Sequence, residues 1–209
     1  IEYSQQKHIP LNIFKKWSSK SNIFQYLGVH YVDLLYWITK FIPISVTAWG
    51  QRDFLKNKNI NTWDSIQVII KWKSIKNEYF ISSHFTNWID PNESSALSDQ
   101  KISIIGTKGR IVSDQKNRGM QIVADKVGVQ DINPYFTSFT KNYNNKLEFS
   151  GYGINSIISY IDNVIKFLDT GVYLGDDRPT FDQALYSTAV LEACKKSLEN
   201  KNKTINIKL

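Results

Sequence analysis

Hydrophobic positions recur along this chain with two different spacings, which separate a strand-rich middle from helical ends. Short segments rich in β-branched and aromatic residues, several of them alternating between polar and apolar positions, predict strands. They are 44–51, 65–73, 78–88, 100–114, 120–125 and 146–151, with the tight turn of a hairpin at 106–110. Because the connections are too short for helical crossovers, we expect a largely antiparallel sheet.

Three further segments repeat their apolar residues at the spacing of an α-helix. They are 29–39, 154–168 and 178–201, and a short strand is expected at 204–209. In the second segment, seven aliphatic residues recur at helical intervals, which predicts a strongly amphipathic helix that ends before Gly171. In the third, Thr180 suits the N-cap position, and Gln183 three residues later completes a capping box. The chain is therefore expected to end in two long helices and a strand.

The order of these elements predicts an α+β fold in a single domain over residues 1–209. An open sheet, mixed or largely antiparallel, is expected to carry the helices on one face. No internal repeat and no linker divides the chain. Strands rich in Trp, Ile and Val should not leave a face in water, so we expect the other sheet face to form a homodimer or homotetramer.

Composition and charge narrow the classes of partner. The 209 residues are 42% hydrophobic and 22% charged, as in ordinary globular domains, and carry a net charge of +7. The lysines are spread out, with their densest runs at 54–59 and 195–203, so no nucleic-acid surface is predicted. No apolar run reaches the length of a membrane span, and the first ten residues are polar. We therefore expect a cytoplasmic protein that binds no membrane.

Cysteine and histidine are too sparse to predict a metal centre. Cys194 is the only cysteine, which excludes a disulfide within the chain, and its helical context predicts a small buried side chain. The three histidines, His8, His30 and His84, lie far apart and lack the spacing of metal ligands. No metal site is expected.

His30 is the candidate for proton transfer. An imidazole titrates near neutral pH, and Asp33 lies about one helical turn further on, where a carboxylate can orient the ring. The alternative is a histidine held in the core by a hydrogen bond to Asp33 or to a backbone carbonyl. Asp33 itself can equally lie on a solvated helix face, so the spacing leaves both residues' roles open.

Two loops offer candidate substrate contacts. They are Asn87 and Asp90 in one loop, and Lys116 and Arg118 in the other. The first pair flanks Trp88, a combination that suits a polyhydroxyl ligand, although Asp-Pro-Asn is also turn chemistry. The second pair can clamp a carboxylate or phosphate, or form a solvated charge cluster.

Motifs for phosphate binding or for an activated nucleophile are absent from the sequence. No Gly-x-Gly-x-x-Gly stands between a strand and a helix, and neither Gly-x-x-x-x-Gly-Lys-Ser/Thr nor Gly-x-Ser-x-Gly occurs. From the residues alone, the chain is an α+β domain with one candidate histidine.

Three stretches nevertheless resemble a known family, that of glucose–fructose oxidoreductase and inositol dehydrogenase (Gfo/Idh/MocA). The segment 27–50 is similar to the start of its C-terminal domain, and 151–207 is similar to the closing helix pair and last strand. The middle, 87–119, resembles a subset in which a GTKG hairpin follows a polar loop. The first segment carries the family's Gly-x-His-x-x-Asp run, then a Trp, a turn with Pro and a strand, here Gly28, His30, Asp33, Trp37, Pro43 and 46–50.

The resemblance implies the second domain of a two-domain oxidoreductase that acts on a sugar, inositol or polyol derivative. The family's N-terminal Rossmann domain binds NAD or NADP, so no cofactor is expected for this chain alone, and Ile1 fits a chain cut from a longer protein. His30 is implied as the proton-transfer residue and Asp33 as its orienting partner. Many members have an Asp four residues before the histidine. Here that position is Tyr26, which can donate or accept a hydrogen bond and is expected, with Asp33, to tune His30 as part of the catalytic site.

A second class of function stays open. A freestanding binding or dimerisation module would keep the fold without the cofactor, and the Tyr at position 26 slightly favours it. A third interpretation is a basic domain that binds anions or nucleic acid. The parent protein is expected to be an NAD(P)-dependent dehydrogenase, whereas the sequence does not decide whether this chain alone is an enzyme.

Overall fold

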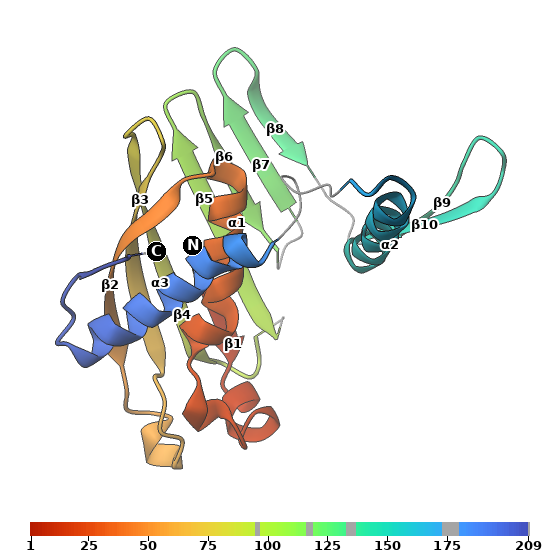
Figure 1. The fold of residues 1–209 in the computed structure, drawn as a ribbon. Coiled ribbons are helices and arrows are strands. Elements are labelled where there is room, and N and C mark those ends of the chain that lie inside the picture. Colours follow the sequence, from red (N-terminus) through yellow and green to blue (C-terminus); the bar gives the residue numbers. More distant parts are fainter. Residues whose placement is uncertain (95–96, 116–118, 133–136, 173–179, 209) are drawn as a thin grey trace.

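An open sheet of nine strands organises the chain (Figure 1). The structure is a computed structural model that describes residues 1–94, 97–115, 119–132, 137–172 and 180–208. The strands are β1 (Glu2–Gln6), β2 (Ile42–Gln51), β3 (Ser65–Lys73), β4 (Tyr79–Asp90), β5 (Ser98–Gly106), β6 (Gly109–Asp114), β7 (Gly119–Ala124), β8 (Gly128–Ile132) and β11 (Ile205–Asn206). Their order is β11-β2-β3-β4-β1-β5-β6-β7-β8, and β1 with β4 is the parallel pair in an otherwise antiparallel arrangement.

Alternation along the central strands gives this sheet one dry face. In β3, every second residue from Ile66 to Trp72 is buried, and the residues between them are exposed. The antiparallel register places the buried residues of β4 opposite those of β3, since Val68 lies opposite His84 and both are buried. Successive side chains on a strand point to opposite faces, so one register is enough to bury the same face of both strands.

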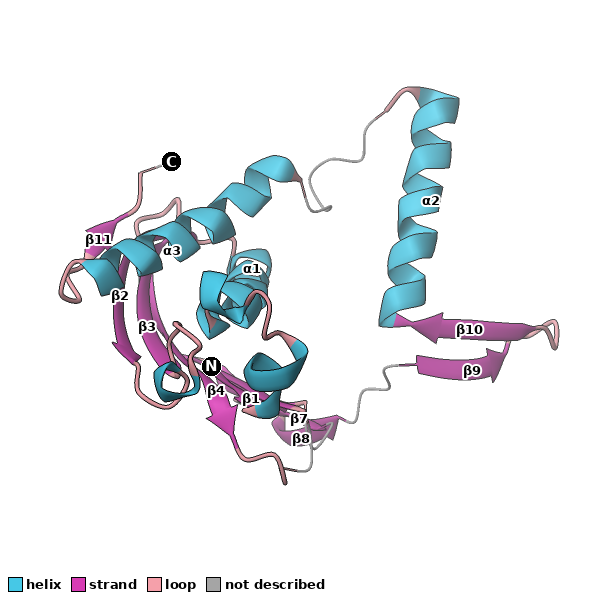
Figure 2. Cartoon of the chain, turned by 90° about the horizontal axis from the view of Figure 1, so that it is seen from below, coloured by secondary structure: helices cyan, strands magenta, loops and turns pink. Residues whose placement is uncertain are grey.

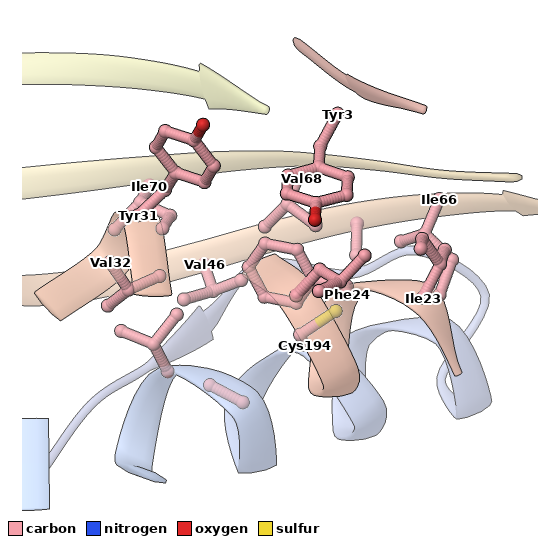
Figure 3. Close-up of a cluster of buried hydrophobic side chains, with 14 of the residues drawn as sticks. Tyr3, Ile23, Phe24, Tyr31, Val32, Val46, Ile66, Val68, Ile70 and Cys194 are labelled. Atoms are coloured by element: carbon pink, nitrogen blue, oxygen red, sulfur yellow. The ribbon is translucent and has the colours of Figure 1, made fainter. Parts of the chain in front are cut away.

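Two helices cover the dry face. Figure 2 shows α1 (Val29–Thr39) and α3 (Phe181–Glu199) on the same side of the sheet, where α3 crosses β2 and contacts α1. The side chains between helices and strands form the core, in which Phe24, Val46, Val68 and Cys194 meet (Figure 3). Cys194 is buried in this core, which confirms the prediction of a small buried side chain, and burial raises the pKa of its thiol to about 12.

Four short helical turns, in the described part of the chain, connect the strands of the large sheet and the helix α1. They are η1 (Ile9–Ile13), η2 (Ser18–Lys20), η3 (Phe24–Gly28) and η4 (Lys56–Lys58). The first and third have π-helical hydrogen bonding, which is rare and usually limited to a single turn. Asp64 closes the loop that contains η4, because its buried carboxylate accepts hydrogen bonds from the backbone N–H groups of Asp53, Phe54 and Leu55 at 2.6–2.7 Å.

The remaining elements form an arm. A hairpin of β9 (Thr137–Lys141) and β10 (Leu147–Gly151) leads directly into α2 (Tyr152–Thr170), and Figure 2 shows these elements away from the layer of α1 and α3. Gly171 ends α2 in the left-handed conformation, with φ at 66°. The apolar stripe of α2 is exposed, and comprises Ile157, Ile158, Ile161, Val164, Ile165 and Leu168.

The expected fold class is confirmed, with the helix 29–39 and the strand 65–73 found at the expected residues. Thr180 is the N-cap of α3 and accepts a hydrogen bond from the backbone N–H of Gln183 at 3.3 Å. Three strands, β1, β8 and β9, were not anticipated. Although β1 is mostly polar, it lies inside the sheet between β4 and β5. Its buried Gln5 is satisfied there, because its side-chain oxygen accepts a hydrogen bond from the indole of Trp88 at 2.8 Å.

Among the described residues, no helix combines the length and the apolar character needed to cross a membrane.

Candidate functional site

A π-helical turn positions the residues implied in proton transfer. The η3 turn, which carries Tyr26, runs directly into α1, so His30 follows Tyr26 by about one turn of helix. Gly28 is required here because a Cβ atom at this position would lie 2.3 Å from the ring of Phe24. Single π-turns are frequent at functional sites because they re-aim the side chains on either side of them.

His30 and Asp33 are both exposed on α1. The alternative of a core histidine is therefore wrong for His30. No hydrogen bond between His30 and Asp33 is found in the part of the chain that the structure describes. A solvent-accessible imidazole can exchange protons with a bound molecule.

The core histidine of this fold is His84 on β4. Its Nε2 atom lies 2.9 Å from the hydroxyl of Ser82, which also accepts a hydrogen bond from the indole of Trp72 at 2.8 Å. The ring of Phe24 packs edge-on against His84 at a centroid distance of 5.7 Å. Burial lowers the pKa of His84 to about 3, so the ring is neutral at ordinary pH.

An aromatic cluster adjoins the η3 turn. The ring of Tyr26 lies 5.1 Å from that of Phe14, 5.5 Å from that of Trp17 and 6.2 Å from that of Trp88, measured between centroids. Trp88 is fully buried, whereas the other three rings are half-buried. The cluster brings together the segment between η1 and η2, the η3 turn and β4, so residues distant in sequence form one apolar wall beside the helix of His30.

The expectation that Asn87 and Asp90 lie in a loop is wrong, because both belong to β4, whose end pairs with β1. The Nδ2 atom of Asn87 donates to the hydroxyl of Ser4 at 2.6 Å, and its Oδ1 atom accepts from the backbone N–H of Ile89 at 3.3 Å. The backbone carbonyl of Asp90 accepts from the N–H of Lys7 at 2.9 Å. Both side chains are half-buried, so the structure brings them to the same strand end and uses the amide of Asn87 to tie β4 to β1.

The second candidate pair, Lys116 and Arg118, lies outside the described residues. Sequence reasoning also missed β1, whose Ser4 and Gln5 hold the end of β4 in place. The sequence pattern gave little indication of this strand, because four of its five residues are polar and none is β-branched.

The described residues do not supply a dinucleotide cradle or a metal cluster. The parallel pair β1 and β4 is not linked through a glycine-rich turn at a helix N-terminus, which is the feature that binds a pyrophosphate. No group of three or more His, Cys, Asp or Glu side chains within the described part of the chain is placed to hold a metal ion.

A family model matches nearly the whole chain and identifies the class. It is the C-terminal alpha/beta domain of the Gfo/Idh/MocA oxidoreductase family, and it matches residues 14–207. The chain therefore belongs to this oxidoreductase family and represents its C-terminal domain. A comparison with curated proteins gives no match.

Solved structures with the same fold include several named as dehydrogenases. An inositol dehydrogenase homolog complexed with NAD+ from Azotobacter vinelandii has a TM-score of 0.70 at 11% identity, covering 98% of this chain and 56% of that one. A UDP-N-acetylglucosamine 3-dehydrogenase from Acidithiobacillus ferrooxidans has a TM-score of 0.61 at 12% identity, with coverages of 97% and 53%. A scyllo-inositol dehydrogenase from Lactobacillus casei, with NAD(H) and scyllo-inositol bound, has a TM-score of 0.54 at 13% identity, with coverages of 98% and 55%. The chain thus spans little more than half the length of these structures, and the likeness concerns the fold.

Proposed function

We propose that this chain is the substrate-side domain of an NAD(P)-dependent oxidoreductase that acts on a sugar, inositol or related polyol derivative. The observation that carries the proposal is the exposure of His30 at the start of α1, immediately after the π-helical turn, in a chain that belongs to an oxidoreductase family. The nicotinamide cofactor would supply hydride chemistry and would be held by a domain outside this sequence. The named relatives support the substrate class, since two of the three are named for inositol and one for a nucleotide sugar.

Each residue of the site has a proposed part in this function. His30 exchanges a proton with the substrate hydroxyl, and Asp33, on the same exposed side of α1, orients the imidazole when substrate is bound. Tyr26 forms part of an aromatic wall against which the C–H face of a polyol can pack. Asn87 and Asp90 contribute polar groups at the end of β4, and Lys116 and Arg118 are proposed as further substrate contacts.

The test is kinetic and uses the longest natural protein that contains this sequence. Reduction of NAD+ or NADP+ is followed with a panel of inositols, free sugars and nucleotide sugars. With an active substrate, His30→Ala should lower kcat by about 100-fold or more, the usual contribution of acid–base catalysis. Ile38→Ala, two turns further along the exposed side of α1, is the matched control and should leave kcat unchanged. An unchanged kcat in His30→Ala would exclude the proton-transfer role.

A non-catalytic binding or dimerisation module is the second candidate, and the Tyr at position 26 slightly favours it. The residue stands where many family members have an Asp, and its ring contacts three other aromatic rings. Such contacts suit a structural residue as well as a site wall. Titration of the complete gene product with NADH and NADPH, followed by nicotinamide fluorescence, separates the two functions, because a module without the cofactor should not bind either nucleotide.

The sheet face opposite α1 and α3 is the proposed dimer face. It exposes Trp49, Ile69, Ile81 and Phe85, which the register places on neighbouring positions of β2, β3 and β4. An apolar surface of this kind is typical of contacts between subunits. Phe85→Glu should reduce the molar mass measured by light scattering to that of a monomer. Ile75→Glu, at the fully exposed tip of the β3–β4 hairpin, should leave the molar mass unchanged.

A further inference from the structure

A hollow of about 390 Å³ lies between the C-terminal half of α3 and the loop that joins β2 to β3. Its volume falls within the range of about 300–1,000 Å³ that is usual for small-molecule sites. Its charged lining residues are three cations and one carboxylate, namely Lys20, Arg52, Lys195 and Glu199. None of the residues assigned above to proton transfer or substrate contact lines it, so it is a separate feature of the molecule.

The guanidinium of Arg52 is held in position within this hollow. Its central carbon lies 5.2 Å from the centroid of the Trp63 ring, and Nη2 donates to the carbonyl oxygen of Asn61 at 3.3 Å and to the side-chain oxygen of the same residue. Trp63 is itself fixed against Gly50, where a Cβ atom would come within 2.4 Å of the ring. A stacked and hydrogen-bonded guanidinium loses little further freedom when it binds a ligand.

Part of this guanidinium has no partner. The Nε atom of Arg52 is buried and makes no hydrogen bond to any described residue. A buried N–H of a charged group is costly to leave unsatisfied, because it has lost its water without gaining an acceptor. Glu199, the carboxylate of the lining, lies 4.0 Å from Lys195 and makes no hydrogen bond to this N–H.

The loop that carries Arg52 is rigid enough to serve as one wall of a site. Asp64 accepts three backbone N–H groups from the start of the loop, and its own N–H donates to the carbonyl of Gln51 at 2.8 Å. The other side of the loop is tied to η2, because the N–H of Asn61 donates to the hydroxyl of Ser19 at 3.2 Å. The walls of the hollow are therefore fixed before any ligand arrives.

We propose that this hollow binds a small molecule through a phosphate group, with Arg52 as the main contact and Lys20 and Lys195 as supporting cations. Guanidinium and ammonium groups around one hollow match the doubly charged phosphate oxyanion, and the planar fork of arginine suits its oxygen atoms. The site goes beyond the proposed oxidoreductase function and does not depend on it.

The experiment measures binding of inorganic phosphate by ³¹P NMR titration of the longest natural protein that contains this sequence, at pH 7.5 and at constant ionic strength set with sodium chloride. Saturable binding is expected, and Arg52→Gln should weaken it about tenfold or more, the usual effect of removing a charge-assisted hydrogen bond. Arg110→Gln, an exposed arginine on β6, is the matched control and should bind phosphate as the native protein does. No saturable binding, or equal affinity in the two arginine variants, would overturn the proposal.

Two more variants keep the test valid if Arg52→Gln fails to fold. Lys195→Gln changes an exposed helix position, with 71% of its side chain accessible, and should weaken phosphate binding without affecting the fold. Trp63→Leu removes the stacking platform but no charge, and should weaken binding about threefold. Acetate, titrated in the same way, should bind at least tenfold more weakly than phosphate; equal or tighter acetate binding would exclude the phosphate class.

Discussion

The two long helices of this chain show how little a sequence pattern says about where a helix is buried. Both α2 and α3 have 19 residues, and α2 has the more regular apolar stripe. Yet α3 buries Val190 and Cys194 against the sheet, whereas Ile161 in the stripe of α2 is 48% exposed. The pattern measures what a helix is able to bury, and the chain's topology decides which helix meets the sheet.

The sheet repeats the same contrast. The strands β3 and β4 bury every second side chain along their central residues, and β2 buries Pro43, Val46 and Ala48, because α1 and α3 cover this part of the sheet. The strands β5, β6 and β7 contain no buried side chain, although they are also rich in β-branched residues. The stability of this chain should therefore reside in the first half of the sheet and its two helices.

The largest expected effect is a charge placed under α3. Val190→Asp should lower the free energy of unfolding by about 4 kcal/mol or more, because an unpaired carboxylate would replace a fully buried side chain. Leu185→Asp, on the same helix but 55% exposed, is the control and should change stability by less than about 0.5 kcal/mol. Urea denaturation followed by circular dichroism measures both. Equal losses would mean that α3 is not anchored as the structure describes.

The next effect compares the two halves of the sheet. Ile70→Ala in β3 should cost about 3 kcal/mol, through lost apolar burial and the cavity left behind. Ile105→Ala in β5, where the side chain is 78% exposed, should cost under about 0.5 kcal/mol. The midpoints of urea unfolding give both values. If the β5 variant lost as much as the β3 variant, the second half of the sheet would have to be covered in solution.

A smaller effect comes from the buried histidine. Burial lowers the pKa of His84 to about 3, so between that pH and about 6.5 the unfolded chain binds a proton that the folded chain does not. Stability should therefore fall as the pH is lowered through this window, by roughly 2 kcal/mol between pH 7.5 and pH 5. His84→Met cannot titrate and should lose correspondingly less over the same range. Identical pH dependence in the two proteins would show that His84 is not buried in its neutral form.

The smallest effect is expected in α2. Ile161→Lys should change the stability of this chain by no more than about 0.5 kcal/mol, because the side chain already lies in water. The matched comparison is Val190→Lys in α3, which should be strongly destabilising. Thermal unfolding of the 209-residue chain measures both. A large loss in Ile161→Lys would mean that the stripe of α2 is covered in solution.

For the candidate site, features set by neighbouring residues could be predicted from the sequence, whereas contacts between distant residues could not. The helix of His30 was found at its expected residues, since its apolar spacing is contained within 29–39. The contact of Tyr26 with Trp88 was not predictable, because 62 positions separate them and only the meeting of η3 with β4 brings the rings within 6.2 Å. The hydrogen bond from Asn87 to Ser4 was missed for the same reason.

The sequence by itself determined the repeating local features: the strands, the long helices, the Thr180 cap and the order of elements that defines the family's C-terminal domain. These follow from neighbours within a few residues, whose spacing is fixed by backbone geometry. Tertiary structure alone decided that His84 rather than His30 is the core histidine, that polar β1 lies inside the sheet, and that Arg52 stacks on Trp63. Each of these depends on which distant elements meet, because burial and hydrogen-bond partners are properties of the assembled fold and not of any single segment.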